Sequence, residues 1–253
     1  MSILESFVKD SQPVITVADC YPKSDIVFQS FIVTFSFRTV EALIEDGLIE
    51  LVAEDGIRSI ACNYPVYRFV GTNIGLIKTT IGAPVASVLI EEMAHIYSCK
   101  KAVIFGSCGA LDKSISEQKL IVPTAAYRDE GTSYHYMEPS DYIALKNAQT
   151  VCKILDLLKV DYVTGKTWTT DGFYRETVEE MAKRKSEGCI AVEMELSACQ
   201  AVSNYAGVDL YAFLYRADNL DSDTWEKGIR DHLLSTDERL KILDVAFEIA
   251  KRI

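Results

Sequence analysis

Short runs of β-branched and aromatic residues alternate along the chain with longer segments of helical periodicity, and this alternation constrains the fold more than any other feature. "KAVIFGSCG" (101–109) and "DLYAFLYRAD" (209–218) are typical of buried strands. "PVASVLIEEMAHIYSC" (84–99) repeats apolar residues three and four positions apart, and its proline suits a first helical turn. Strands that alternate with helices predict an α/β protein.

The remaining segments extend this pattern over the whole chain, 1–253. Further strands are predicted at 26–37, 66–82, 118–131 and 191–195. A helix is predicted over 140–158, with Ser140 or Asp141 as N-cap, and the last helix opens with a capping box of Ser235 and Glu238. No linker or repeat divides the chain, so we expect a single domain with a mixed, distorted central sheet flanked by helices.

The charge of the chain limits its partners. The 253 residues carry a formal net charge of −11, and the pI is near 4.8. A phosphate backbone would be repelled, so we expect no nucleic-acid partner. We find no long apolar window and no secretion leader, so we expect no membrane span and a cytoplasmic location. A small anionic substrate would need local cations or backbone N–H groups.

The cysteines do not predict a metal centre. There are seven of them, none with C-x-x-C spacing, and only three histidines accompany them. Zinc sites require clustered thiolate and imidazole ligands, so we expect no metal and mostly buried, reduced thiols.

Two strand ends carry residues that suit an anion. In "FGSCGAL" (105–111), glycines around Ser107 allow backbone N–H groups to approach a ligand, although a tight turn alone would use the same residues. In "KTTIGAP" (78–84), Thr79 and Thr80 precede a helix N-terminus, where one of them could bind an anion or simply cap the helix.

Two further strand ends carry residues that suit a flat ring and a proton transfer. "TWTTDGFYRET" (167–177) contains Trp168, Phe173 and Tyr174, which form either a stacking platform or packing against the sheet. In "LYRADNLDSD" (214–223), Asp218 ends an apolar strand. An apolar surrounding raises the pKa of a carboxyl group and suits a general acid, whereas an Asp–Asn turn is the alternative.

Glu193 and Glu195 lie in a segment that is otherwise apolar, "GCIAVEMELSACQAV" (188–202). A buried carboxylate without compensation is costly, so each must be paired, protonated or facing a cleft. Together with the four strand ends, these residues supply what cleavage at C1′ of a nucleoside requires.

The motifs "GSCGA", "TTDGFYRET" and "AVEMELSA", with a strand ending in "RAD", resemble the nucleoside phosphorylase superfamily, which includes uridine phosphorylase and hexameric purine nucleoside phosphorylase. "YRDEGTSYHYMEPS" and "WTTDGFYRET" are most similar to the uridine-phosphorylase-like branch. The resemblance extends from about Val70 to the C-terminus. It implies an α/β fold with a distorted sheet and a homo-oligomer, either a hexamer or a dimer.

The resemblance also implies roles for single residues. Glu195 would accept hydrogen bonds from the ribose hydroxyls, and Met194 would pack under the sugar. Phe173 would stack on the base, and Glu193 would support the base-side pocket. Asp218 would be the general acid that protonates N7 of a leaving purine.

The phosphate contacts follow the family pattern less well. Ser107 and Thr79 match phosphate-binding positions, and Arg38 in "FSFRT" is the best match to an arginine of the N-terminal phosphate loop. A second family arginine is replaced by Ile104, and a third, from a neighbouring subunit, aligns near Ile60. A rearranged anion site would draw on the basic residues of this half of the chain: Arg38, preferred, then Arg58, Arg68 and Lys78.

The expected function is therefore a nucleoside phosphorylase. Phosphate, as co-substrate and with no other cofactor, would attack C1′ of a purine nucleoside or uridine to give the free base and (deoxy)ribose 1-phosphate. Asp218 favours a purine, and the branch resemblance favours uridine. A hydrolytic nucleosidase and a nucleoside-binding protein without turnover are the alternatives, because the usual phosphate arginines are replaced.

Overall fold

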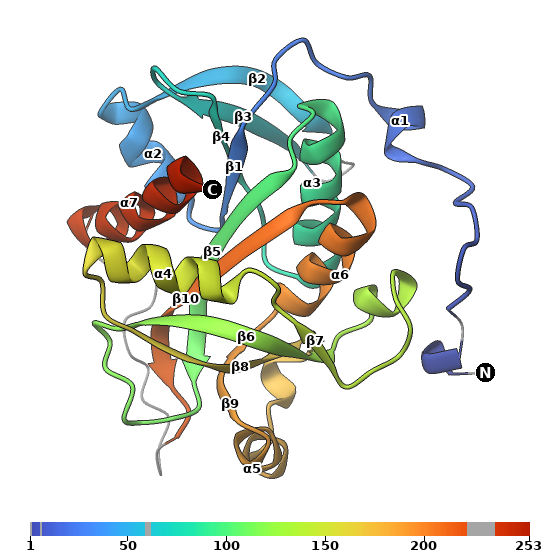
Figure 1. Cartoon of the computed structure of the whole chain (residues 1–253), viewed down its shortest axis with the longest axis vertical. Helices are drawn as coiled ribbons and strands as arrows, with labels where there is room; N and C mark the ends of the chain where they lie inside the picture. The colour runs from blue at the N-terminus through green and yellow to red at the C-terminus, as the bar shows by residue number, and fades with distance from the viewer. Residues whose placement is uncertain (1, 6, 59–61, 222–235) are drawn as a thin grey trace.

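The computed structural model describes residues 2–5, 7–58, 62–221 and 236–253, and its ten strands form one mixed sheet (Figure 1). The sheet order is β10-β6-β8-β9-β5-β1-β4-β3-β2, with β7 paired to β6. The strands are β1 (Ser30–Thr34), β2 (Ile49–Arg58), β3 (Asn63–Phe69), β4 (Ile74–Lys78), β5 (Lys101–Ala110), β6 (Leu120–Asp129), β7 (Tyr142–Ala144), β8 (Tyr162–Thr170), β9 (Cys189–Glu193) and β10 (Asp209–Asn219).

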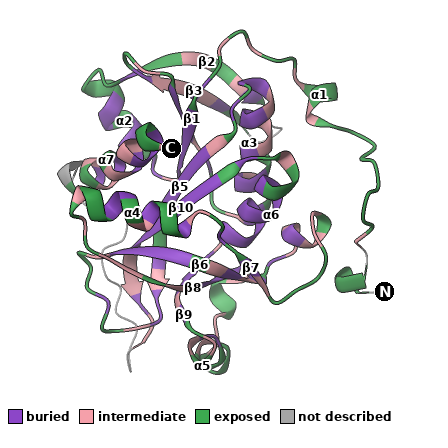
Figure 2. Ribbon diagram, in the orientation of Figure 1, coloured by how far each residue is buried: buried purple, intermediate pink, exposed green. Residues whose placement is uncertain are grey.

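Helices cover both sides of this sheet. The α-helices are α1 (Val17–Cys20), α2 (Phe37–Glu45), α3 (Ala83–Ile96), α4 (Ala148–Leu158), α5 (Val178–Ser186), α6 (Leu196–Ala206) and α7 (Thr236–Arg252), and the short 3₁₀ helices are η1 (Ile3–Glu5), η2 (Thr132–His135) and η3 (Phe173–Arg175). α3 and α6 pack on one side, and α2, α4 and α7 pack on the other (Figure 1). Burial is concentrated in the strands and the facing sides of these helices (Figure 2). This confirms the α/β fold. None of the described helices is long and apolar enough to cross a membrane.

Half of the sheet closes on itself. β5 pairs with β10 in parallel, β10 with β6, β6 with β8, β8 with β9, and β9 returns to β5 through Gly109 and Ala110. A sheet that pairs around a ring must bend strongly, so the predicted distortion is confirmed.

A β-bulge in β10 places Asp218. The register between β5 and β10 shifts between Arg216 and Asp218, which leaves Ala217 as the extra residue and sets Asp218 opposite Gly109. A Cβ atom on Gly109 would lie 3.1 Å from Oδ1 of Asp218 and only 2.3 Å from the side chain of Leu220. Glycine is therefore required for this close approach.

The structure differs from several of the predicted elements. The segment 66–82 is a hairpin of β3 and β4, turning at Gly71 with φ +73°. In the segment 26–37 only Ser30–Thr34 is a strand, because Ser36 accepts a hydrogen bond from the N–H of Thr39 and starts α2. The strand in 101–109 continues through its glycines to Ala110 and makes no turn there.

The predicted helix start at Ser140 or Asp141 is wrong. Tyr142–Ala144 pair with β6 as β7 and bury Ile143, and α4 begins later, after Asn147. Ser140 instead accepts a hydrogen bond from the guanidinium group of Arg128. Ser235, expected in a capping box, lies outside the described residues.

Candidate active site

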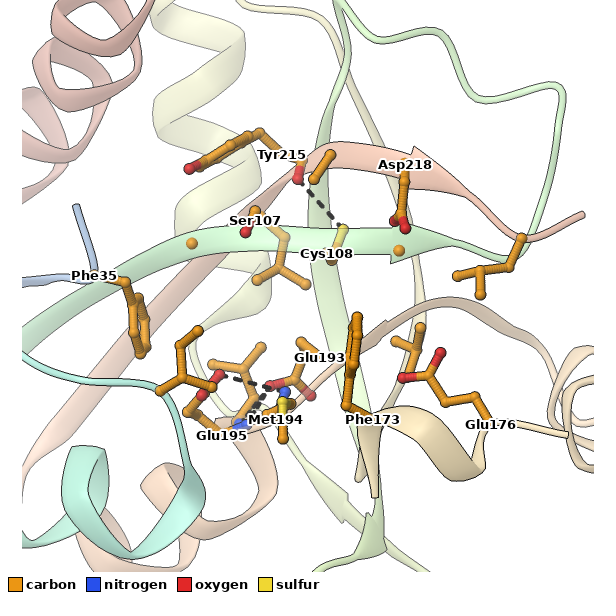
Figure 3. A pocket seen from close by; sticks show the side chains of 18 of the residues that line it. Phe35, Ser107, Cys108, Phe173, Glu176, Glu193, Met194, Glu195, Tyr215 and Asp218 are labelled. Carbon is orange, nitrogen blue, oxygen red and sulfur yellow. Dashed lines mark hydrogen bonds between the residues drawn. The ribbon is translucent and has the colours of Figure 1, made fainter. Parts of the chain in front are cut away.

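A cavity of about 920 Å³ opens where the carboxyl ends of β1, β5, β9 and β10 meet the segment around η3 (Figure 3). Ligands gather at such strand ends in open α/β sheets, because loops there can present side chains without breaking the core. Six of the predicted site residues line it: Ser107, Phe173, Glu193, Met194, Glu195 and Asp218.

β5 and β10 form one wall of the cavity. Ser107 is exposed to it, and the thiol of Cys108 donates to the carbonyl oxygen of Tyr215 at 3.5 Å. Burial raises the pKa of Cys108 far above its ordinary value, so this thiol stays neutral. Asp218 faces the same space from β10 (Figure 3).

Glu195 joins the first residues of two helices. It is the N-cap residue of α6, and its Oε1 accepts a hydrogen bond from the N–H of Gly82, the N-cap residue of α3, at 2.7 Å. Its Oε2 accepts from the N–H of Met194 at 3.3 Å. Burial raises its pKa to about 8, the charge of Glu193 adds to the shift, and the two N–H groups oppose it. The side chain is only 8% exposed, and this small part faces the cavity.

Glu193 is held almost entirely by the protein. Its Oε2 accepts from the N–H groups of Glu195 and Leu196, each at 2.7 Å, and its Oε1 accepts from the hydroxyl of Thr169 at 2.5 Å. Burial raises its pKa to about 7. These bonds fix the first turn of α6, so Glu193 orients Glu195. Its predicted part in base binding stays a prediction.

The aromatic residues of 167–177 separate into two groups. Trp168 is 2% exposed and donates from Nε1 to Asp129 at 2.9 Å, so it packs in the core. Phe173 and Tyr174 line the cavity, with ring centroids 5.0 Å apart in an edge-on arrangement. The ring of Phe173 stands between Glu193 and Glu176, across the cavity from Asp218 (Figure 3).

Thr79 and Arg38, predicted to bind phosphate, are not among the residues of the cavity wall. Thr79 is 1% exposed, and its N–H and hydroxyl donate to the carbonyl oxygens of Thr34 and Thr80. Arg38 is exposed on α2, with its guanidinium group over the ring of Phe37. Arg68 pairs with Glu50 on the far end of the sheet, and Ile60 lies outside the described residues.

The sequence did not indicate two residues of the wall that bear on its chemistry, Phe35 and Glu176. Phe35 lies in "FSFRT", the segment matched to the phosphate loop, where the basic residue alone was considered. Glu176 precedes Thr177, the N-cap of α5, whose capping box with Glu180 could have been identified in the sequence. A residue just before an N-cap lies in a loop, where it can face a ligand.

The chain matches the model of the phosphorylase superfamily over residues 33–248. The chain belongs to the phosphorylase superfamily. The match includes residues before Val70, where the motifs match the family poorly.

Two curated relatives are purine nucleoside phosphorylases of the DeoD type. The protein of Aliivibrio fischeri is 25% identical over 192 residues, covering 74% of this chain and 77% of the relative. The protein of Alkaliphilus metalliredigens is 27% identical over 181 residues, covering 68% and 78%.

Two solved structures share the fold. The purine nucleoside phosphorylase of Toxoplasma gondii in complex with immucillin-H superposes with a TM-score of 0.70 at 20% identity, covering 89% of this chain and 91% of that one. The AMP nucleosidase of Bacteroides thetaiotaomicron superposes with a TM-score of 0.67 at 18% identity, covering 89% of each chain.

The raised pKa of Glu195 makes stability depend on pH. Its pKa is about 8 in the folded chain and 4.5 for an ordinary glutamate side chain, so the folded state binds more protons between these values. The free energy of unfolding therefore falls as pH rises from 5 to 8, by on the order of 1 kcal/mol per pH unit for such a group. Urea unfolding from pH 5 to pH 8 should show a shallower decline in Glu195→Gln than in wild type. The exposed variant Glu138→Gln should keep the wild-type slope, and equal slopes in all three proteins would contradict the prediction.

Proposed function

We propose that the protein is an enzyme that cleaves the N-glycosidic bond of purine nucleosides. The observation that carries this proposal is the meeting of Glu195, Phe173 and Asp218 in one cavity, although they come from three separate segments. They provide a group that accepts from sugar hydroxyls, a ring face for the base and a proton donor. The purine nucleoside phosphorylases among the relatives support the same reaction.

The chemistry follows from the positions of the carboxyl groups. The ribose hydroxyls would donate to Glu195, next to Met194. As the bond from C1′ to the base nitrogen breaks, its electron pair leaves with the base and the sugar becomes oxocarbenium-like. A proton from Asp218 to N7 neutralises the leaving purine, and Glu195, in its ionised form, offsets the positive charge on the sugar.

The molecule that bonds to C1′ and accepts the sugar can be either phosphate or water. Phosphate would yield ribose 1-phosphate, as the expected phosphorylase function requires, and Ser107 is the predicted phosphate contact that lines the cavity. Water would yield ribose. Both reactions break the same bond and use the same sugar and base contacts.

Glu176 supports a purine rather than uridine. It lines the cavity on the side of Phe173 and Asp218, and burial together with the charge of Asp218 raises its pKa to about 7 (Figure 3). An ionised carboxylate only accepts hydrogen bonds, so it suits the adjacent N–H groups of guanine or the N1–H of hypoxanthine. The single N3–H of uracil lies between two carbonyl groups that would repel it.

The predicted homo-oligomer also remains a proposal. Ile81, Tyr174 and Val178 line the cavity and are 69%, 93% and 72% exposed. Apolar side chains gathered at the mouth of a site form a surface of the kind that a second subunit covers.

The first test is base release from inosine, guanosine, adenosine and uridine, followed by chromatography. We expect release from the purine nucleosides, and kcat/KM lower by about a hundredfold or more in Glu195→Gln, because a charge-assisted contact to the sugar is lost. Circular dichroism and thermal unfolding should show an intact fold in the variant. Normal turnover in Glu195→Gln would exclude the ribose role.

Asp218 is tested through the leaving group. Asp218→Asn cannot donate a carboxyl proton, so it should slow natural purine nucleosides by roughly two to four orders of magnitude. A nucleoside analogue whose leaving group departs without protonation should lose far less. Equal losses on both substrates, compared as kcat/KM, would assign Asp218 a binding role instead.

Glu176 is tested through selectivity. Glu176→Gln should lower kcat/KM for guanosine and inosine by about tenfold to a hundredfold and change uridine by less than about threefold. The adjacent exposed variant Glu179→Gln serves as the matched control and should behave as wild type. A uniform loss across all nucleosides would contradict a role in reading the base.

A further inference from the structure

Phe35 occupies the end of the cavity that lies away from the base side. Its side chain stands on the side of Ser107 and Glu195, whereas Phe173 and Glu176 lie across the cavity (Figure 3). The ring packs on Gly106, the first glycine of "GSCG": a Cβ atom there would lie 3.0 Å from Cδ2 and 3.2 Å from Cε2 of Phe35. An aromatic ring therefore covers backbone that a bare glycine would leave open to a ligand.

The connection between β1 and α2 fixes this ring. Thr34 ends β1, and its carbonyl oxygen accepts from the N–H of Thr79 at 2.8 Å. On the other side, Ser36 caps α2 by accepting from the N–H of Thr39 at 3.3 Å. Phe35 is the one residue between two anchored neighbours, so its backbone has little freedom to move the ring away.

The helix N-termini at this cavity already bind the chain's own oxygen atoms. Ser36 caps α2, the N–H of Gly82 at the start of α3 donates to Glu195, and the first N–H groups of α6 donate to Glu193. Helix N-termini attract anions through such N–H groups and the helix dipole. Here the acceptors that use them are the protein's own side-chain oxygen atoms.

Acidic side chains and no basic ones line the wall among its described residues. Within the part of the chain that the structure describes, the ionisable acids of the wall are Glu176, Glu193, Glu195 and Asp218. Ile81 and Ile104 add apolar surface to the same wall. A phosphate dianion in these surroundings would lose hydration without meeting a positive charge, and each of these acids that is ionised would repel it.

We propose, on the basis of the nucleoside cleavage proposed above, that the sugar acceptor is a neutral water molecule, held at the end of the cavity that Phe35 and Ser107 line. The water oxygen forms a bond to C1′ as the bond from C1′ to the base breaks. The electron pair of the broken bond goes to the base, which takes its proton from Asp218. The water releases one proton to solvent, Asp218 regains a proton from solvent, and the products are the free base and ribose.

The experiment compares base release by the wild-type protein in phosphate-free buffer and at ~20 mM phosphate, with ³¹P NMR to detect ribose 1-phosphate and a reducing-sugar assay to detect ribose. We expect a rate change of less than about twofold and ribose as the sugar product. Phosphate-dependent release with ribose 1-phosphate would overturn the proposed acceptor and leave the cleavage itself intact.

A calorimetric titration of the wild-type protein with inorganic phosphate tests, without any turnover, whether the cavity end at Phe35 and Ser107 binds phosphate. We expect no saturable binding up to ~20 mM, and saturable binding in the millimolar range or tighter would overturn the inference. If no nucleoside releases its base with or without phosphate, the proposed function fails. The titration then still shows whether the protein binds phosphate.

Phe35→Ala uncovers Gly106, and Phe37→Ala is its matched control because Phe37 is exposed on α2 outside the cavity wall. We expect base release by Phe35→Ala to respond to phosphate by at least about threefold, as acceleration or competitive inhibition, whereas Phe37→Ala should respond as wild type does. If phosphate leaves the rate of base release unchanged in both variants, the ring of Phe35 does not exclude the anion. The wild-type measurements stand by themselves if Phe35→Ala does not fold.

Discussion

The parallel pairing of β5 with β10 is the constraint on which the site depends. It runs from Lys101 and Asp209 to Ala110 and Asn219, and it closes the bent half of the sheet. Because both strands run in the same direction, their polar ends meet at one edge. The bulge at Ala217 then shifts the alternation of side chains, so that Asp218 faces the cavity beside Ser107. Without this shift, the period of two would direct Asp218 to the opposite face.

The two carboxyl groups of "VEME", Glu193 and Glu195, differ in how completely the protein satisfies them. Glu193 accepts three close hydrogen bonds from its own chain, which compensate for its burial and set the first turn of α6. Glu195 accepts two backbone bonds and keeps a small exposed part toward the cavity. A carboxyl group held by the protein therefore lies directly behind one that reaches the cavity. Burial, and after it the charge of Glu193, raises the pKa of Glu195 and links this residue to the stability of the fold.

The sequence predicted most of this site because its motifs lie at the ends of strongly apolar strands. Such strands are identified by residue type alone, so Ser107, Glu195 and Asp218 could be placed at one edge of the sheet. What failed depended on partners distant in sequence. Tyr142–Ala144 are a strand only because β6 is beside them, and Thr79 is withdrawn from the cavity by its bond to Thr34. Phe35 was missed because only the basic residue of "FSFRT" was compared with the family's phosphate loop. The importance of Phe35 comes from the contact of its ring with Gly106, which is distant in sequence.

The hydrogen bond from Gly82 to Glu195 also determines how the site responds to a ligand. Gly82 has φ +119°, a conformation that side chains disfavour, so the direction of its N–H is fixed by the backbone. Each carboxylate oxygen has a second lone pair, so both oxygens can accept sugar hydroxyls while the backbone bonds remain. The rotamer entropy of Glu195 has therefore already been lost on folding. A ligand that donates hydrogen bonds to Glu195 would therefore meet a side chain that is already in place.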